Sequence, residues 1–221
     1  MNHPEIASRE DWQRQRDDLL LAEKELTRTR DAINARRRQL PMTEITRDYV
    51  FASTARNDLR LIDLFEGREQ LIVYHNMLTA DHICPGCSFF CDNLMNNFAH
   101  LHARGTSFVM VARAQVPRIE AVKARMGWTF PWVSCAGSSF HEDFVTAQDN
   151  AYFGLSVFIR QGDRVFQTWF TSGRGVEAAS NTFNLLDLTP RGRRETWEQS
   201  PAGWPQDPPY SWSRLHDEYP A

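Results

Sequence analysis

The run Leu71-Ile72-Val73-Tyr74 constrains the fold more than any other part of the chain. Successive side chains of a strand point to opposite faces, so these four residues place apolar groups on both faces. Such a strand is typical of the centre of a sheet that helices cover on both sides. Segment 106–112 (TSFVMVA) has the same character and predicts a second buried strand. The two runs predict an α/β domain.

The order of the remaining elements narrows the fold class. In chain order, we expect strands in DYVFAS, LRLIDLF and QLIVYHNM, a helix from about Pro85 to Ala103, a strand at 106–112, a helix over 117–127, a short strand in FPWVSC, a hairpin in LSVFIRQGDRVFQTWF and a helix in GVEAASNTFNLLDL. Parallel strands need crossover helices, and the hairpin supplies antiparallel strands. This order predicts a mixed central sheet flanked by helices, as in thioredoxin-like domains.

A long helix is expected before this domain, over residues 8–40. Ser8 is suited to cap it together with Asp11, and Pro41 ends it. Apolar residues recur every seven positions, at Trp12, Leu19, Leu26, Ile33 and Leu40. One narrow stripe is less than a full coiled-coil seam, so the helix needs a surface to lie on. That surface is either its own domain or a second subunit, and we favour a homodimer.

The sequence therefore predicts three parts. Residues 1–41 form an N-terminal helical arm, 42–189 the thioredoxin-like domain, and 190–221 an irregular tail. The tail contains six prolines, three tryptophans and two tyrosines without a sustained period. Its aromatic residues indicate that it packs on the body of the protein.

Composition excludes several classes of function. The net charge is −3, which gives no overall basic field for nucleic acid or an anionic membrane surface. No segment approaches the ~20 apolar residues that span a bilayer. The N-terminus lacks the basic start and apolar stretch of a secretory signal. We expect a cytoplasmic protein, where close cysteines are more often catalytic or metal-binding than structural.

Three of the four cysteines lie in one segment, at Cys84, Cys87 and Cys91. Cys84 follows a buried strand and a loop, and Pro85 suits the first position of the next helix. The free N–H groups of a helix N-terminus favour a thiolate at Cys84, and Cys87 lies one turn further along. This placement predicts a redox pair in which Cys84 attacks a disulfide or oxidised substrate and Cys87 resolves the intermediate.

Other interpretations of this segment stay open. Cys91, one turn after Cys87, is expected to be a buried thiol, with a reserve resolving role as the alternative. The three thiols with His82 or His75 could supply four metal ligands. However, structural zinc usually draws ligand pairs from two separate segments, so no metal is expected. An inert cysteine pair is the third interpretation.

Weaker candidates surround the pair. His82 precedes Cys84 by two residues and is a candidate to stabilise the thiolate or donate a proton, and His75 ends the central strand. Asp81 is a candidate acid–base group, although a loop carboxylate is usually solvated. Cys135 follows FPWVS and is expected to be a core cysteine unless its loop approaches the site.

CPGC between a buried strand and a helix resembles the thioredoxin superfamily. Together with GREQLIVYHNM, CPGCSFFCDNL, AHLHARGTSFVMVARA, IEAVKARMGWTFPWVSC and FNLLDLTPRGRRE, it is similar to a bacterial thioredoxin-like family of unknown function, DUF899, over about residues 30–219. That family has been loosely described as dithiol-disulfide isomerase-like. The resemblance implies the thioredoxin-like fold but no particular reaction.

The sequence departs from thioredoxin in three places. The inner dipeptide is Pro-Gly rather than Gly-Pro, Ile83 replaces the tryptophan before the first cysteine, and Phe153-Gly154-Leu155 stands where thioredoxins carry a substrate-contacting proline. GWTFPWVS resembles a peroxiredoxin segment. However, peroxiredoxins carry threonine or serine three residues before the catalytic cysteine, where this chain has Asp81, whose charge would raise the thiol pKa.

The sequence thus predicts a thiol–disulfide oxidoreductase with Cys84 as nucleophile and Cys87 as resolving thiol. Its substrate is a disulfide or other oxidised compound, its reductant is unspecified, and no cofactor is expected. The alternatives are a peroxiredoxin-like peroxidase and a non-enzymatic binding module with the same fold.

Overall fold

The computed structural model describes residues 3–95, 97–149 and 151–220. The chain divides into two compact units, each described by itself. The N-terminal unit comprises Met1–Pro41 and Gln199–Pro205, and the sheet unit comprises Met42–Glu198 and Gln206–Ala221. The three-part division expected from the sequence stays a prediction.

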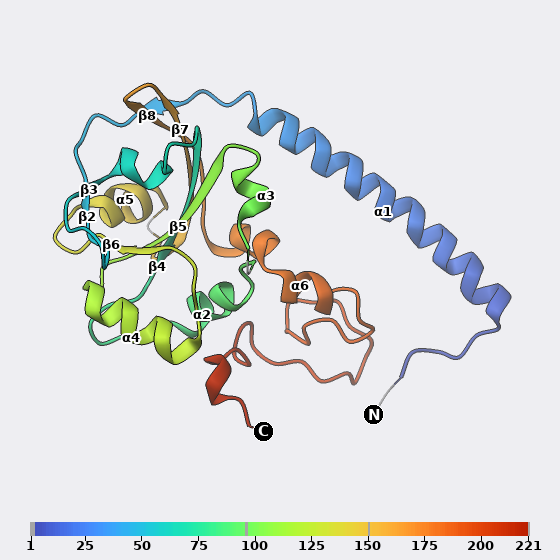
Figure 1. The fold of residues 1–221 in the computed structure, drawn as a ribbon. Helices are drawn as coiled ribbons and strands as arrows, with labels where there is room; N and C mark the ends of the chain where they lie inside the picture. Colours follow the sequence, from blue (N-terminus) through green and yellow to red (C-terminus); the bar gives the residue numbers. More distant parts are fainter. Residues whose placement is uncertain (1–2, 96, 150, 221) are drawn as a thin grey trace. The chain divides into compact units, whose positions relative to one another are not determined.

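The sheet unit is built on a mixed six-stranded sheet in the order β1-β8-β7-β4-β5-β6. The strands are β1 (Thr43–Glu44), β4 (Gln70–Asn76), β5 (Thr106–Ala112), β6 (Trp132–Ser134), β7 (Gly154–Gln161) and β8 (Arg164–Thr171). Parallel pairing joins β4 to β5 and β5 to β6, whereas β7, β8 and β1 pair antiparallel. Figure 1 shows β4, β5, β7 and β8 through the middle of this unit. The predicted mixed sheet is confirmed.

The two strands expected at the centre are β4 and β5. Every residue of β5 is buried, and Leu71, Val73 and Tyr74 of β4 are almost fully buried. The hairpin β7–β8 turns at Gly162, which has a φ of 60°. Outside the sheet, β2 (Val50–Phe51) and β3 (Leu59–Arg60) form a small antiparallel pair.

Each face of the sheet carries its own apolar cluster. On the first face, Tyr74 and Met110 pack with side chains of α2 (Pro85–Asp92), α3 (Ala99–His102) and α4 (Val116–Met126). The second face is covered by η1 (Leu61–Phe65) and by η2 (Glu142–Thr146), which continues into α5 (Ala147–Asp149). Layers on both faces explain why the central strands alternate so little between apolar and polar residues.

Two expected elements differ in the structure. LRLIDLF was expected to be one strand, but only Leu59–Arg60 pairs, and η1 follows, because the Asp63 carboxylate accepts a hydrogen bond from the Arg60 N–H at 2.8 Å. The helix expected to Ala103 ends at Asp92. Asn93 caps that end: its side-chain amide donates to the Phe89 carbonyl, and its Oδ1 accepts from the Thr182 N–H.

The last expected helix is divided as well. It consists of the 3₁₀ helix η3 (Gly173–Ala179) and α6 (Asn181–Leu186), with Ser180 in extended conformation between them. A short 3₁₀ helix, η4 (His216–Glu218), lies near the C-terminus. Segment 206–220 packs on the sheet unit, since Leu215 is buried and Arg125 of α4 pairs with Asp217 at 2.7 Å.

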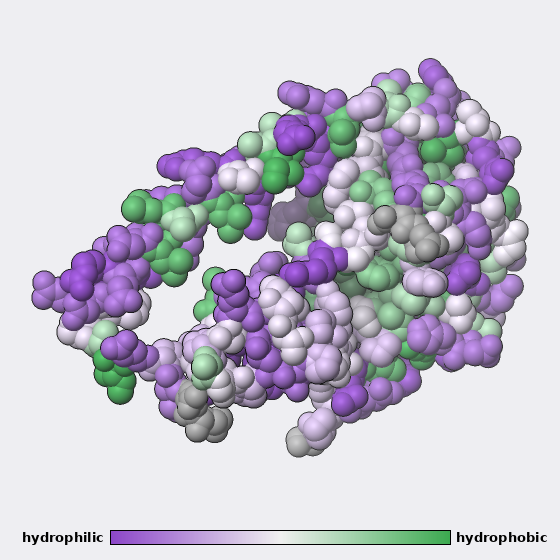
Figure 2. Space-filling model, turned by 180° about the vertical axis from the view of Figure 1, so that it is seen from behind, coloured by the Kyte–Doolittle hydropathy of each residue, from purple (hydrophilic) through white to green (hydrophobic). Residues whose placement is uncertain are grey.

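The N-terminal unit contains the long helix α1 (Arg9–Arg37), and its predicted cap is confirmed. The Ser8 hydroxyl accepts a hydrogen bond from the Asp11 N–H at 3.0 Å and donates to the Asp11 carboxylate. None of the residues of α1 is buried. The heptad residues Trp12, Leu19, Leu26 and Ile33 keep between 47% and 61% of their surface exposed. Figure 2 shows apolar residues along this helix.

The stripe on α1 predicts self-association. Acidic residues occupy the first turn of the helix and Arg36 and Arg37 the last, so an antiparallel pair would bring opposite charges together. We expect the full chain to elute as a dimer in size-exclusion chromatography with light scattering, and Leu19→Glu combined with Leu26→Glu to be monomeric. Leu188→Glu, at another exposed leucine, is the matched control. A monomeric parent chain would contradict the prediction.

Candidate active site

Cys84 is the N-cap residue of α2, and its backbone is extended with φ −80° and ψ 120°. Pro85 occupies the first helical turn, where a missing N–H costs nothing. The Cys84 sulfur accepts a hydrogen bond from the Cys87 N–H at 3.3 Å. The side chain is only partly buried, so the sulfur that receives the helix N–H group is open to a substrate.

The surroundings of Cys84 favour its thiolate. A hydrogen bond from the Cys87 thiol, the backbone N–H groups of Cys87 and Gly86, and the His82 side chain together lower the pKa of Cys84 to about 6, against burial, which acts to raise it. A pKa in this range favours the thiolate at neutral pH.

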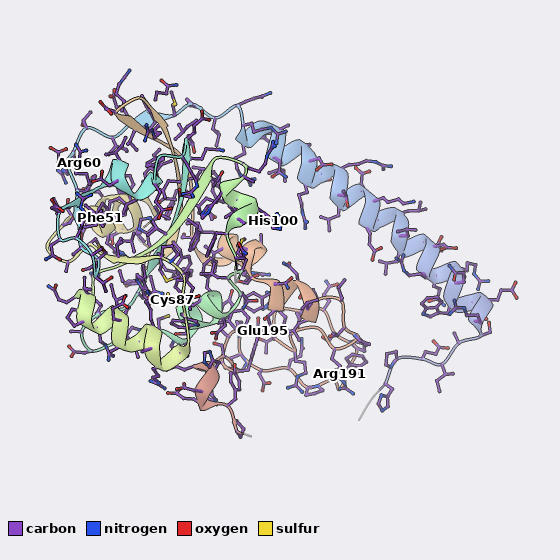
Figure 3. The ribbon with its side chains drawn as sticks, in the orientation of Figure 1. Phe51, Arg60, Cys87, His100, Arg191 and Glu195 are labelled. Carbon is purple, nitrogen blue, oxygen red and sulfur yellow. The ribbon has the colours of Figure 1, made fainter. Side chains whose placement is uncertain are left out.

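The surroundings of Cys87 disfavour its thiolate, in contrast to those of Cys84. It is buried, and desolvation together with the neighbouring Cys84 raises the pKa of its thiol well above the usual value. The Tyr74 hydroxyl and the Met77 N–H both donate to its sulfur at 3.5 Å. The Tyr74 ring stacks on Phe90 with centroids 3.8 Å apart, which fixes the hydroxyl in place. Figure 3 shows Cys87 at the beginning of α2.

Cys91 lies deeper along α2 and is buried. Its thiol donates to the Met110 sulfur at 3.5 Å, and the Asn76 amide donates to the Cys91 sulfur at 3.7 Å. Burial raises the pKa of this thiol well above its usual value. These contacts agree with the expected buried thiol.

The two residues expected in the loop before Cys84 are exposed. His82 contributes a side-chain hydrogen bond that lowers the pKa of Cys84, so the structure brings this histidine to the thiol. Asp81 is exposed, as expected for a solvated loop carboxylate. No group of three or more His, Cys, Asp or Glu side chains is placed to hold a metal ion within the part of the chain that the structure describes.

His75, a candidate tuning residue from the sequence, does not face the thiols. Side chains alternate along β4, so Tyr74 faces the cysteines and His75 the opposite face of the sheet. There His75 is fully buried, shares a 2.8 Å hydrogen bond with Ser156 and stacks on Phe140. Cys135 belongs to the same opposite face and is buried, so its loop does not approach Cys84.

The buried His75 predicts a loss of stability in acid. Burial, followed by the repulsion of His141, lowers its pKa from 6.5 to about 3 in the folded protein. Below pH 6.5 the unfolded chain binds a proton that the folded chain does not. The free energy of unfolding should therefore fall by up to about 1.4 kcal/mol per pH unit between these two pKa values.

Urea unfolding between pH 7 and 5 measures this slope, with His75→Gln as the comparison. The glutamine amide can keep the hydrogen bond to Ser156 but does not titrate. The variant should lose less stability on acidification than the parent protein. Equal slopes would show that His75 is protonated in the folded state.

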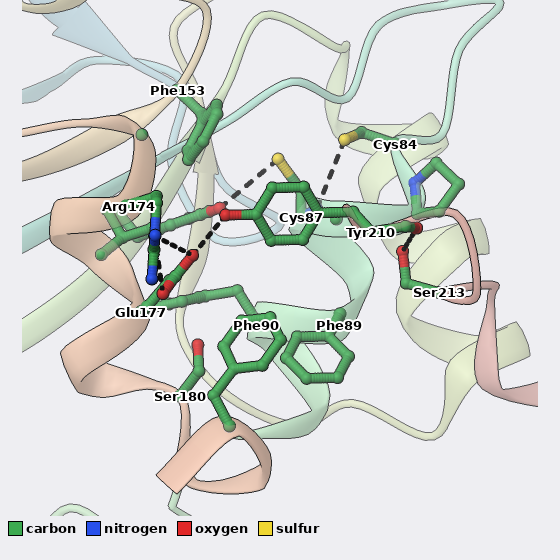
Figure 4. Close-up of a pocket in the computed structure, with 16 residues that line it drawn as sticks. Cys84, Cys87, Phe89, Phe90, Phe153, Arg174, Glu177, Ser180, Tyr210 and Ser213 are labelled. Carbon is green, nitrogen blue, oxygen red and sulfur yellow. Dashed lines mark hydrogen bonds and ion pairs between the residues drawn. The ribbon is translucent and has the colours of Figure 1, made fainter. Parts of the chain in front are cut away.

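A cavity of about 530 Å³ lies beside the cysteine pair. Cys84 and Cys87 form part of its wall, and η3 and the segment near Tyr210 form the wall across from them (Figure 4). Most of the lining is aromatic or apolar. It includes Tyr74, Phe89, Phe90, Phe153, Val176, Phe183 and Tyr210.

The lining contains two charged side chains, Arg174 and Glu177. They form an ion pair with each other and with charged neighbours outside the lining. Glu177 pairs with Arg174 at 3.3 Å and with the buried Arg193 at 2.8 Å, and it accepts a hydrogen bond from the Tyr210 hydroxyl. Burial acts to raise the pKa of Glu177, but the bonds from Arg193 and Tyr210 outweigh it and lower the pKa. The Arg193 guanidinium also forms a bidentate contact with Asp187, donating to both carboxylate oxygens at 2.8 Å.

Sequence reasoning missed most of this cavity. Glu177 was part of the expected final helix, and Tyr210 was one of several aromatic residues in the tail. Neither residue belongs to a recognisable sequence motif. Each reaches the cavity only because segments far apart in the chain pack together. Phe153 and Gly154 were noted only as a departure from thioredoxin. A Cβ at Gly154 would lie 2.6 Å from the Phe170 ring and 2.7 Å from the Thr171 carbonyl, so this position requires glycine.

The strand order, with two parallel strands joined through α2 and an antiparallel hairpin beside them, defines a thioredoxin-like protein. Its Cys-Pro-Gly-Cys segment begins the first crossover helix. Over residues 1–219 the chain matches the family described as "Bacterial protein of unknown function (DUF899)", and it belongs to that family. The match includes the long N-terminal helix.

Comparison with solved structures gives distant matches. An uncharacterized conserved protein from Geobacillus kaustophilus is 15% identical, with a TM-score of 0.36 over 55% of this chain and 65% of that one. A putative protein disulfide isomerase from Bacteroides thetaiotaomicron is 12% identical, with a TM-score of 0.41 over 66% of this chain and 89% of that one. A search of curated proteins finds no match. None of the described helices is both long and apolar enough to cross a bilayer.

Proposed function

We propose that the protein is a thiol–disulfide oxidoreductase with Cys84 as nucleophile and Cys87 as resolving thiol. The observation that carries the proposal is the placement of the two thiols: the Cys84 sulfur is partly exposed at the N-cap of α2 and accepts the Cys87 N–H, whereas Cys87 is buried along the same helix. These surroundings lower the Cys84 pKa and raise the Cys87 pKa. A pair of this kind supplies a reactive thiolate at neutral pH and a second thiol that is held in reserve. A reducing compartment such as the cytoplasm would maintain it.

The reaction follows from the two positions. The Cys84 thiolate attacks one sulfur of a substrate disulfide, forms a mixed disulfide and releases the other half as a thiolate, which takes up a proton. Cys87 then gives up its proton and attacks the Cys84 sulfur, which releases the second substrate thiol. The substrate gains two electrons, and the protein retains a Cys84–Cys87 disulfide. An external dithiol restores the reduced pair by the same exchange in reverse.

The polar contacts of Cys87 suit the second step. The Tyr74 hydroxyl and the Met77 N–H both point at its sulfur, so they would stabilise the thiolate that forms when Cys87 loses its proton. His82, at the exposed side of Cys84, is placed to donate a proton to the departing thiolate. Asp81 and His75 have no role in this scheme.

Alkylation of the reduced protein across pH tests the assignment. Cys84 should react with iodoacetamide with a midpoint near pH 6, whereas Cys87, Cys91 and Cys135 should stay unmodified at neutral pH. Peptide mass spectrometry identifies the modified residue. After treatment with a small disulfide, the same method should detect an internal Cys84–Cys87 bond. First modification at Cys91, with Cys84 inert at pH 7, would overturn the proposal.

A non-enzymatic binding module is the second candidate, because the cavity beside the cysteines has the size and apolar lining of a ligand pocket. The two candidates differ in their need for the Cys84 sulfur. A module would retain its ligand without that sulfur, whereas an oxidoreductase would lose its turnover.

A further inference from the structure

The cavity beside Cys84 restricts which disulfides can reach the sulfur. From its walls we infer that the substrate is a small, uncharged disulfide with an aromatic or other apolar substituent, rather than a protein disulfide or a charged one. This inference rests on the proposed function and deepens it. The 530 Å³ cavity falls within the range of pockets that enclose small organic molecules.

The shape of the site carries the first part of the inference. Thioredoxin-like proteins that reduce other proteins need an open surface around the nucleophile, where an extended chain can lie. Here η3 and residues 210–213 stand across from the beginning of α2 and make a wall. The Tyr210 ring lies across the cavity with its hydroxyl on Glu177, as Figure 4 shows. A cavity of about 530 Å³ has room for an aromatic substituent and is far too small to enclose a folded polypeptide.

The wall is held by buried polar contacts. Glu195 is fully buried and accepts hydrogen bonds from the Tyr210 N–H at 2.7 Å and from the Trp212 indole at 2.9 Å. Tyr210 has a φ of 60°, a conformation that a tyrosine adopts only when its surroundings impose it. The Ser213 hydroxyl donates back to the Tyr210 carbonyl at 2.9 Å. These hydrogen bonds make the wall an ordered part of the folded protein.

The charges carry the second part. Arg174 and Arg193 lie around Glu177, and Asp187 pairs with Arg193, so two positive and two negative groups cancel locally. Arg174 also stacks its guanidinium on Trp197, 3.9 Å from the ring centroid. Apart from the Cys84 thiolate, each charged side chain among the described residues of this lining is paired with an opposite charge. A carboxylate on the substrate would lose its hydration in this cavity without gaining an unpaired cation, and it would face the Cys84 thiolate.

The aromatic lining carries the third part. Phe153 stands at the beginning of β7, and Phe89 packs against Phe183 with centroids 4.6 Å apart. Together with Val176 they surround the space in front of Cys84 and Cys87. Such walls stabilise an apolar ring by burial and by ring contacts.

Three disulfides of different chemistry test the inference in a coupled assay with dithiothreitol as reductant. Dithiodipyridine is small, aromatic and uncharged at neutral pH, dithiobis(nitrobenzoate) is similar in size but carries two carboxylates, and insulin presents protein disulfides. Each rate is divided by the rate of the same disulfide with N-acetylcysteine, which removes differences in intrinsic reactivity. We expect dithiodipyridine to exceed both others at least about tenfold.

Variants of one wall residue sharpen the test. Phe153→Ala should raise KM for dithiodipyridine about tenfold, because burial against the phenyl ring is lost, and leave kcat nearly unchanged. Tyr152→Ala, next to it but exposed, is the matched control and should change neither. Phe153→Lys should shift the preference toward dithiobis(nitrobenzoate), since it adds an unpaired positive charge.

The outcomes separate the two proposals. Equal normalised rates for insulin and dithiodipyridine, or identical behaviour of Phe153→Ala and Tyr152→Ala, would overturn the inference while leaving the oxidoreductase intact. If Cys84→Ser reduces all three disulfides as fast as the parent protein does, the proposed function itself fails, and the substrate inference fails with it.

Discussion

Cys84→Ser should reduce the turnover of dithiodipyridine by on the order of a thousandfold, because a serine hydroxyl neither ionises near neutral pH nor attacks sulfur. The substitution changes one atom at a partly buried helix N-cap. Serine is itself a good N-cap residue, so the N–H of Cys87 keeps its acceptor and the fold should remain stable. Steady-state rates and thermal unfolding of the same preparation distinguish lost chemistry from lost structure.

Two further variants make this result specific. Cys87→Ser should retain the first attack but accumulate a mixed disulfide on Cys84, which mass spectrometry detects as the added mass of one substrate half. Cys135→Ala removes a buried cysteine on the opposite face of the sheet and should keep full turnover. If the parent protein showed no turnover and Cys84→Ser bound the ligand as tightly as the parent does, the cavity would belong to a binding module.

The sequence predicted the sheet well because its signals are local. The buried strands β4 and β5, the hairpin β7–β8 and helix α4 each carry enough periodicity or turn chemistry within one segment to fix their type. Errors arose where a side chain overrode local propensity. Asp63 turned an expected strand into η1, and Asn93 caps α2, which ends at Asp92, directly after Cys91; in each case the side chain bonds to the backbone.

The site likewise has parts that the local sequence predicts and parts that it does not. The position of Cys84 at the start of a helix follows from Pro85 and the preceding strand, so the sequence alone places it. The direction of His75 depends on the register of β4 within the sheet, and a single position along the strand moves it to the other face. The cavity depends on contacts between residues more than a hundred positions apart, such as Phe89 with Trp212. No sequence motif predicts such contacts.

Those long-range contacts depend on one buried carboxyl group, Glu195. It follows α6 in the chain (Figure 3) and accepts hydrogen bonds from the Tyr210 N–H and from the indole groups of Trp197 and Trp212, at 2.7, 2.6 and 2.9 Å. These three donors are drawn from separate positions in the tail. Glu195 therefore fixes the segment that closes the cavity opposite Cys84.

Glu195→Ala should lower the free energy of unfolding by about 3 kcal/mol, because it leaves three donors without an acceptor in a buried place. For a chain of this size the melting temperature should fall by roughly 6–12 °C. Differential scanning calorimetry measures the loss. Glu69→Ala, at an exposed glutamate, is the control and should change the melting temperature by less than about 2 °C.

The same variant connects stability to function. Without Glu195, the Tyr210 N–H loses its buried acceptor and its left-handed conformation is less well supported, so the wall of the cavity should open more often and limited proteolysis should cut near residues 206–213. The Cys84 thiolate depends on α2 instead, so the pH midpoint of its alkylation should stay near 6. KM for dithiodipyridine should rise while this midpoint stays constant. A shift of the alkylation midpoint together with KM would show that the tail controls the thiol itself and not only access to it.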